Sequence, residues 1–167
     1  KNGLGYVKDE NNVRYIKTIP TLPSLGLTVA GITVTAANAE NVLDEVNEET
    51  ELPTVVFDAE NNILTLNGAY IYVESEDAIV SSLENLTIFL VGDNNISCYG
   101  DKMFNKTSAV DEATITFTTD EESNGSLSFM CLEEQIYGFG VTPVYNNVFI
   151  KHVGDSHYIN SSLGIKI

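Results

Sequence analysis

The chain has no tryptophan, a single arginine, two histidines and two cysteines among its 167 residues. No run of eighteen apolar residues occurs, which excludes a transmembrane helix and predicts no membrane span. Nucleophile-elbow, zinc-protease, phosphate-loop and C-x-x-C motifs are all missing, so the sequence predicts no enzyme and no resident cofactor. Two cysteines, Cys98 and Cys131, do not make a disulfide framework, and the sequence leaves open whether they pair.

Basic residues are also scarce over most of the chain. Residues 18–150 hold 21 of the 24 acidic residues and two basic ones, which gives that region a charge of −19. The two ends, 1–17 and 151–167, together carry a charge of +3. An acidic body repels phosphate backbones, so the sequence predicts no nucleic-acid partner.

What the sequence does contain is an alternation of apolar and polar residues with a period of two. This pattern, separated by Asn- and Gly-rich turns, predicts an all-β protein. One short helix is expected over 38–46, where Asn38 can cap and Val42, Leu43 and Val46 form an apolar stripe. The expected strands are "GITVT" (31–35), "ILTLNGAYIYV" (63–73), "NLTIFLV" (85–91), "ATITFTT" (113–119) and "SLSFM" (126–130).

The spacing of these segments predicts how the strands are arranged. Aligning "ILTLNG" with "NLTIFLVG" places Leu64 over Leu86, and the next segment, "ATITF", begins at Ala113. Steps of about 20–30 residues favour a right-handed parallel β-helix-like stack of short strands. A β-sandwich with long connections is the alternative.

Three stretches between residues 25 and 97 carry a resemblance to a known kind of protein. "GLTVAGITVTAANAENVL", "VVFDAENNILTLNGAYI" and "AIVSSLENLTIFLVGDNNI" resemble repeat units of large surface and secreted proteins of gut bacteria. Such units are grouped with carbohydrate-binding, pectate-lyase-like β-helix domains. The resemblance implies this architecture and an extracellular or cell-surface location, but it assigns no binding residue, because the shared motifs are strand and turn residues.

Two sets of side chains are candidate sites. Tyr70 and Tyr72, two residues apart on one strand, and Tyr99 after the following strand could form an aromatic platform for a sugar; ordinary strand tyrosines are the alternative. Oxygen ligands in turns make calcium the one metal considered, although turn chemistry explains the same residues. The residues considered for calcium are Asp58, Glu60 and Asp93.

The two ends of the chain repeat one another. Gly3-Leu4-Gly5 matches Gly138-Phe139-Gly140, and Asn11-Asn12-Val13 matches Asn146-Asn147-Val148, both at the same offset. We therefore interpret residues 1–24 as the tail of a preceding repeat unit and 25–167 as one complete unit. This hypothesis predicts the same strand-like element at both ends, with Val13, Ile16, Val148 and Ile150 buried.

These observations predict a non-catalytic, secreted or cell-surface repeat module with an adhesion or spacer role. Its expected partners are neighbouring repeat units and a polysaccharide or host surface. The alternative is a dedicated carbohydrate-binding domain or, further from the evidence, a polysaccharide-processing enzyme.

Overall fold

The computed structural model describes residues 4–8, 14–18, 21–100, 102–107, 109–131, 136–153, 158–160 and 164–166. This part of the chain is all-β: it forms seventeen strands in four sheets and contains no helix. Accordingly, no helix of the length and apolar character needed to cross a bilayer occurs in these residues.

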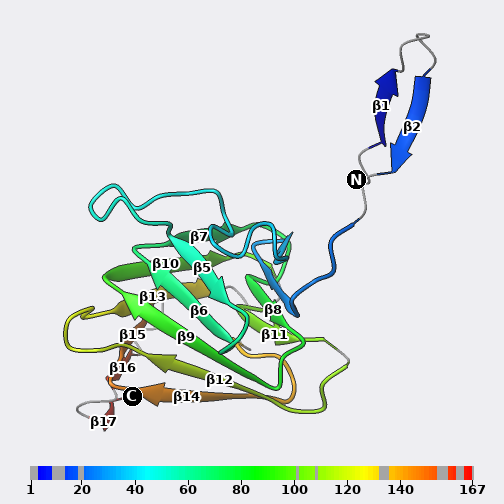
Figure 1. Ribbon diagram of the computed structural model, residues 1–167. Helices are drawn as coiled ribbons and strands as arrows, with labels where there is room; N and C mark the ends of the chain where they lie inside the picture. Colours follow the sequence, from blue (N-terminus) through cyan, green and yellow to red (C-terminus); the bar gives the residue numbers. More distant parts are fainter. Residues whose placement is uncertain are drawn as a thin grey trace.

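The first sheet joins four parallel strands, β6, β9, β12 and β14, to β5, which pairs with β6 in the antiparallel direction. In Figure 1 these strands lie one below another at the front of the body. Its strands are β5 (Val55–Asp58), β6 (Ile63–Asn67), β9 (Asn85–Val91), β12 (Ala113–Thr118) and β14 (Val141–Asn146).

The second sheet lies behind the first and, like it, consists of parallel strands extended by antiparallel ones (Figure 1). Four parallel strands, β7, β10, β13 and β15, are followed by two antiparallel ones. They are β7 (Tyr70–Val73), β10 (Asp93–Cys98), β13 (Ser126–Cys131), β15 (Phe149–His152), β16 (Tyr158–Asn160) and β17 (Gly164–Lys166).

A third sheet contains the parallel pair β8 and β11, extended by two antiparallel strands in the order β11-β8-β3-β4. A separate antiparallel hairpin near the start of the chain is formed by β1 and β2. The bounds are β3 (Leu27–Val29), β4 (Ile32–Thr33), β8 (Ile79–Ser81), β11 (Phe104–Lys106), β1 (Leu4–Lys8) and β2 (Arg14–Thr18).

The corner between the first and second sheets uses left-handed backbone at every passage. Gly68, Gly92, Asn124 and Asn147 have φ angles of 59°, 60°, 43° and 51°. Glycine and asparagine tolerate this conformation better than other residues, which explains their recurrence between the strands. The asparagine-rich turns of the sequence therefore serve as corners as well as hairpin loops.

The observed register corrects the predicted alignment of the strands. Leu64 pairs with Ile88 and not with Leu86, and Leu86 itself pairs with Ile115. The predicted partner of Leu64 is displaced by two positions along its strand. Every side chain nevertheless stays on the predicted side of its strand, because successive residues alternate between the two faces.

The core lies between the sheets and is filled by the inward residue of each alternating pair. In β9, for example, Leu86, Ile88 and Leu90 are fully buried while the residues between them are not. Cys98 and Cys131 also point inward and occupy paired positions on β10 and β13 as free thiols. Burial raises the pKa of the Cys98 thiol above its ordinary value.

The helix expected over 38–46 is wrong, because this segment forms consecutive turns. Its local backbone bonds are limited to tight turns, and it also pairs with β5: the Val42 amide donates to the Val55 carbonyl at 2.9 Å, and the Phe57 amide donates to the Ala39 carbonyl at 2.8 Å. Asp44 has a left-handed φ of 57°, which would interrupt a helix in any case. Tertiary pairing has overridden a short helical pattern.

The matching ends both contain two strands but differ in their pairing. β1 and β2 pair with each other, whereas β14 pairs with β12 and β15 pairs with β13. The prediction of one shared element is therefore wrong at the level of pairing. Val148 and Ile150 are buried as predicted, while Val13 and the side chain of Ile16 lie outside the described residues.

Candidate functional site

The three tyrosines considered as a platform lie on the outward side of the second sheet. Tyr70 and Tyr72 extend from β7, and Tyr99 follows the last residue of β10; their exposed fractions are 60%, 47% and 41%. The rings of Tyr72 and Tyr99 are in contact, with centroids 5.6 Å apart and planes inclined by 54°. The structure thus brings together residues from two separate strands of the sequence.

Small polar side chains continue this surface beyond the tyrosines. Asn95 pairs with Tyr70 and Ser97 pairs with Tyr72 across β7 and β10. The hydroxyl of Ser97 donates to Oδ1 of Asn95 at 3.1 Å. On the next strand, Ser128 pairs with Asn95. We call the outward side chains of Tyr70, Tyr72, Asn95, Ser97, Tyr99 and Ser128 the tyrosine face.

Tyr72 has a carboxylate neighbour at the edge of the tyrosine face. Its hydroxyl donates to Oε1 of Glu74 at 3.4 Å. Desolvation, followed by the negative charge of Glu74, raises the pKa of Tyr72 above its ordinary value. The phenol is protonated at neutral pH, and its O–H group donates to Glu74.

A cavity of about 710 Å³ opens at the corner where β6 passes to β7 and β9 passes to β10. Tyr70 is one of its lining residues, so the cavity adjoins the tyrosine face. We call it the corner groove. Every charged residue that lines it is acidic, namely Glu45, Glu48, Glu49, Asp93 and Glu122.

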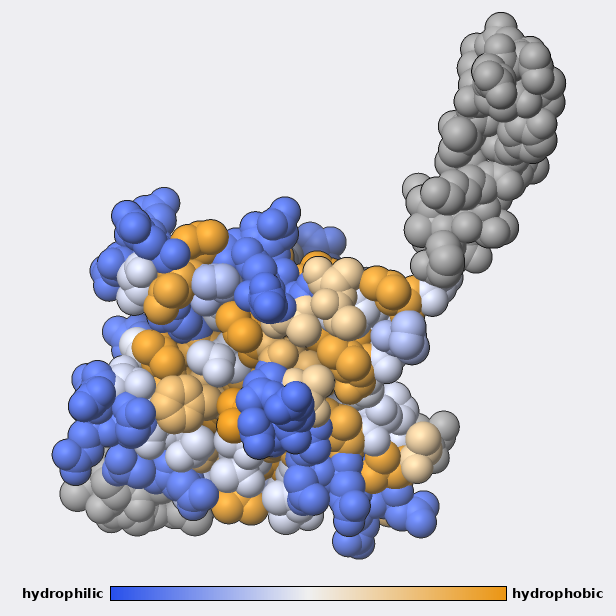
Figure 2. All heavy atoms as spheres, viewed as in Figure 1, coloured by the Kyte–Doolittle hydropathy of each residue, from blue (hydrophilic) through white to orange (hydrophobic). Residues whose placement is uncertain are grey.

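The loop over residues 45–52 forms one wall of the corner groove and is held in place by asparagines. Nδ2 of Asn47 donates to the main-chain oxygen of Asn67 at 3.0 Å, and Nδ2 of Asn67 donates to the hydroxyl of Thr50 at 2.9 Å. Gly68 permits this approach, because a Cβ there would lie 2.3 Å from Nδ2 of Asn47. Figure 2 shows hydrophilic residues gathered at this projection, at the upper left.

A buried asparagine supports the same corner from inside. Oδ1 of Asn94 accepts from the Ala69 amide at 2.8 Å, and its Nδ2 lies 3.1–3.2 Å from the carbonyls of Val91, Gly92 and Ser126. Its side chain therefore links three successive passages between the sheets. Sequence reasoning missed this role, although an asparagine at an inward position of the pattern is a detectable signal.

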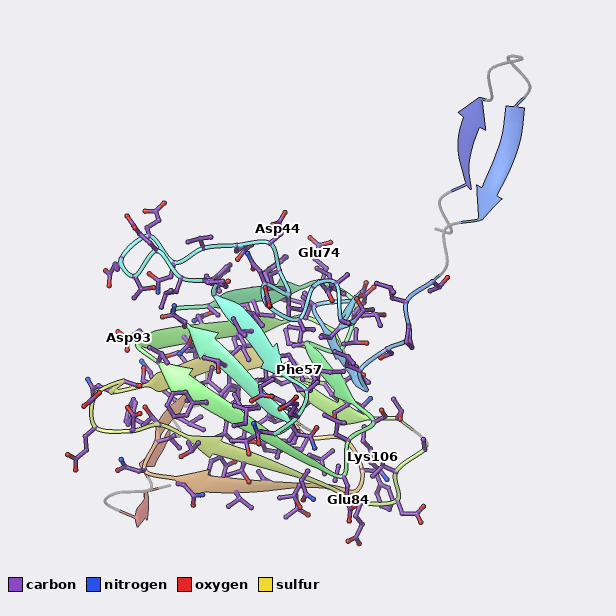
Figure 3. All side chains as sticks on the ribbon, viewed as in Figure 1. Asp44, Phe57, Glu74, Glu84, Asp93 and Lys106 are labelled. Carbon is purple, nitrogen blue, oxygen red and sulfur yellow. The ribbon has the colours of Figure 1, made fainter. Side chains whose placement is uncertain are left out.

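The residues considered for calcium are not brought together. Asp58 ends β5, beside the start of β6, whereas Asp93 follows the other end of the neighbouring strand β9 (Figure 3). Asp58 accepts hydrogen bonds from the amides of Glu60 and Asn61 and from Nδ2 of Asn61. These bonds hold the pKa of Asp58 below its ordinary value, with the Asn61 side chain as the largest cause. Within the described ranges, no three His, Cys, Asp or Glu residues are grouped to hold a metal ion.

Comparison of the chain with protein-family models, with curated proteins and with solved structures found no significant match.

Proposed function

We propose that this chain is a non-catalytic module of a secreted or cell-surface protein, and that its tyrosine face contacts polysaccharide. The observation that carries the proposal is the contact between Tyr72 and Tyr99 beside the exposed ring of Tyr70. Sugar rings present apolar C–H faces that pack on aromatic rings, while their hydroxyls need hydrogen-bonding groups alongside. The tyrosine face offers both.

The flanking residues support a ligand that lies across several strands. Asn95 and Ser128 are partly exposed and shorter than tyrosine, so they leave room above β10 and β13 next to the rings, whereas Ser97 is buried beside them. Amide and hydroxyl groups can both donate and accept, as sugar hydroxyls require. Strands in one sheet are about 4.8 Å apart, so a surface of three strands spans roughly two sugar units.

We propose that the fold is a short right-handed parallel β-helix with antiparallel additions at its ends. Its support is the sequence order of the strands: the series β6-β7-β8, β9-β10-β11 and β12-β13 enter the three sheets in the same order each time. Each strand of one series pairs in parallel with its counterpart in the next. Such a stack gives a flat lateral face suited to an extended polymer.

A place in a tandem array is part of the same proposal. The repetition of the chain's two ends, with Asn11-Asn12-Val13 matching Asn146-Asn147-Val148, supports it. In such an array the module would combine adhesion with spacing, and repeated weak glycan contacts would add by avidity.

Affinity electrophoresis through gels containing neutral or acidic polysaccharides, with and without calcium, tests the proposed function. We expect at least one polysaccharide to retard the protein, and the double variant Tyr70→Ala/Tyr72→Ala to abolish retardation. The matched control is Thr114→Ala/Thr116→Ala, which changes two outward strand residues of the first sheet. Migration unaffected by any glycan would refute glycan binding and leave the spacer role as the remaining function.

A further inference from the structure

The two cysteines of the chain occupy matching positions on neighbouring strands of the second sheet. Cys98 is the last residue of β10, Cys131 is the last residue of β13, and the two are direct partners in the parallel register (Figure 1). Both side chains point into the core, with exposed fractions of 0% and 8%, and both are free thiols in this structure. The fold therefore brings together two thiols that are far apart in the sequence.

The spacing of the two strands suits a covalent bond between these thiols. Direct partners on neighbouring strands have Cα atoms about 4.8 Å apart, and cysteines joined by a disulfide have Cα atoms roughly 4.4–6.8 Å apart. The Cβ atoms of a disulfide are roughly 3.5–4.5 Å apart, so closing the bond requires the strands to approach slightly. This movement is easiest at the end of a ladder, and the ladder between β10 and β13 ends at this pair.

The two thiols already interact in the reduced protein. Burial is the largest cause of the raised pKa of the Cys98 thiol, and the neighbouring Cys131 thiol also raises it. Sγ of Cys98 lies 3.2 Å from the carbonyl oxygen of Lys102 and 3.7 Å from that of Glu76. Because a thiol is a weak donor, little is lost when this sulfur turns toward Cys131 instead.

We propose that Cys98 and Cys131 form a disulfide that joins β10 to β13 and stabilises the parallel strands of the second sheet. This inference goes beyond the proposed function and requires no glycan. It uses only the secreted or cell-surface location proposed above, because disulfides form and persist in such oxidising environments. The oxidant is a low-molecular-weight disulfide, of the class of oxidised glutathione or cystine.

The bond forms in two exchange steps that conserve atoms and electrons. The thiolate of Cys131, the more exposed of the two, attacks one sulfur of the small disulfide, whose S–S bond breaks and releases one small thiolate. The thiolate of Cys98 then attacks Sγ of Cys131, which forms the protein disulfide and releases the second small thiolate. The two cysteine sulfurs lose two electrons to the oxidant, and their two protons are taken by the two leaving thiolates.

A bond at this position would act on both the unfolded chain and the tyrosine face. The segment between the two cysteines includes β11 and β12, so the bond closes a long loop and lowers the entropy of the unfolded chain. Tyr99 directly follows Cys98, and its ring contacts Tyr72. The bond would therefore also fix the strand end that carries one ring of the tyrosine face.

Oxidation of the full chain tests this inference. The reduced protein is incubated with oxidised glutathione to completion and then denatured in acid; its free thiols are counted with a chromogenic reagent, and its intact mass is measured. We expect both thiols to disappear and the protein to remain a monomer whose mass is lower by two hydrogen atoms. Persistent free thiols, glutathione that stays attached, or dimers linked through cysteine would each overturn the proposal.

Thermal unfolding of the two redox forms measures the effect of the bond. The oxidised protein should unfold roughly 10 °C above the reduced protein, and dithiothreitol should remove the difference. The matched control is Cys98→Ala/Cys131→Ala, whose unfolding temperature should not respond to the oxidant. The comparison of the two wild-type forms stands even where the double variant fails to fold. An oxidised form that is no more stable than the reduced one would overturn the stabilising role of the bond.

Alkylation of the native protein tests the order of attack. Cys131, studied in Cys98→Ala, should react with iodoacetamide at least about tenfold faster than Cys98 does in Cys131→Ala, because Cys98 is completely buried. Equal rates would show that both thiols react only when the core opens, and would overturn the assigned order. Because neither measurement involves a glycan, its outcome is independent of glycan binding.

Discussion

The outward positions of the second sheet include exposed tyrosines and small polar residues, whereas those of the first sheet include several threonines. Thr116 pairs with Thr87, and Thr114 pairs with Thr142, across strands built with the same parallel pairing. We call these four residues the threonine face. In the view of Figure 2 pale and apolar residues predominate over β6, β9 and β12.

The two sheets differ in whether strand formation alone accounts for their outward residues. Threonine is favoured in strands because its branched side chain packs on the pleat, so the threonine face is explained by the fold alone. Three neighbouring tyrosines with 41–60% exposure leave much of their ring surface in contact with solvent. The tyrosine face is therefore the surface on which a functional hypothesis can be tested, and the threonine face supplies its controls.

The largest expected effect comes from breaking the core that both faces share. Phe104 is fully buried, with its ring centroid 5.1 Å from that of Phe117 and 5.7 Å from that of Tyr137. Phe104→Ala should lower the free energy of unfolding by about 3–5 kcal/mol. Phe139→Ala, the same change at a site with 91% exposure, should alter it by about 0.5 kcal/mol or less. Denaturant titration followed by circular dichroism measures both.

A loss of stability of this size should also affect the tyrosine face. Because both sheets pack on one core, glycan retardation should be lost together with stability in Phe104→Ala at temperatures where the variant unfolds. A variant with wild-type stability would show that the cluster around Phe104 is not part of the cooperative core.

Removing the Asn94 side chain, which supports the corner between the first and second sheets, should have the next largest effect on stability. Asn94→Ala removes a buried amide that bonds to four backbone groups and leaves some of them unpaired. We expect a loss of about 2–3 kcal/mol in the free energy of unfolding. Asn95→Ala is the control, since this neighbour points outward to the tyrosine face. Equal losses in the two variants would contradict the role assigned to Asn94.

Much of this comparison could be predicted from the sequence, because alternation fixes which side chains point inward. The pattern in "ILTLNGAYIYV" places Ile71 inside and Tyr70 and Tyr72 outside, as observed. Register was harder: nothing local distinguishes Leu86 from Ile88 as the partner of Leu64, since both are inward aliphatic residues. A shift of two positions keeps the same faces buried, so the hydrophobic pattern cannot detect it.

The corner groove could not be predicted, because it depends on segments that are far apart in sequence. The run "NEETEL" indicates only an acidic loop, and its position over the corner is set by the long-range hydrogen bond between Asn47 and Asn67. The failed helix over 38–46 has the same origin, since pairing with β5 decides the conformation there. Local sequence patterns therefore predict which side of a strand is buried. They do not predict where long-range hydrogen bonds place the loops.

The smallest expected effect concerns the hairpin between β5 and β6, at the edge of the sheet that bears the threonine face. Hydrogen bonds from Asn61 and Glu60 lower the pKa of Asp58 in the folded chain. A lowered folded pKa means that the carboxylate form is favoured by folding, so its stabilisation is present above the unfolded pKa. That stabilisation disappears as the pH falls through the folded pKa.

Asp58→Asn should therefore be less stable than the wild type at neutral pH, and the difference should shrink as the pH falls below about 4. Glu60→Gln is the control, because it removes the same charge from the same turn without removing the hydrogen bonds that Asp58 accepts. Protonation of the many other carboxylates changes the stability of all three proteins alike, so the comparison cancels it. Thermal unfolding measured across this pH range decides the matter: a difference between wild type and Asp58→Asn that stays constant with pH would mean that the hairpin turn does not depend on the charge of Asp58.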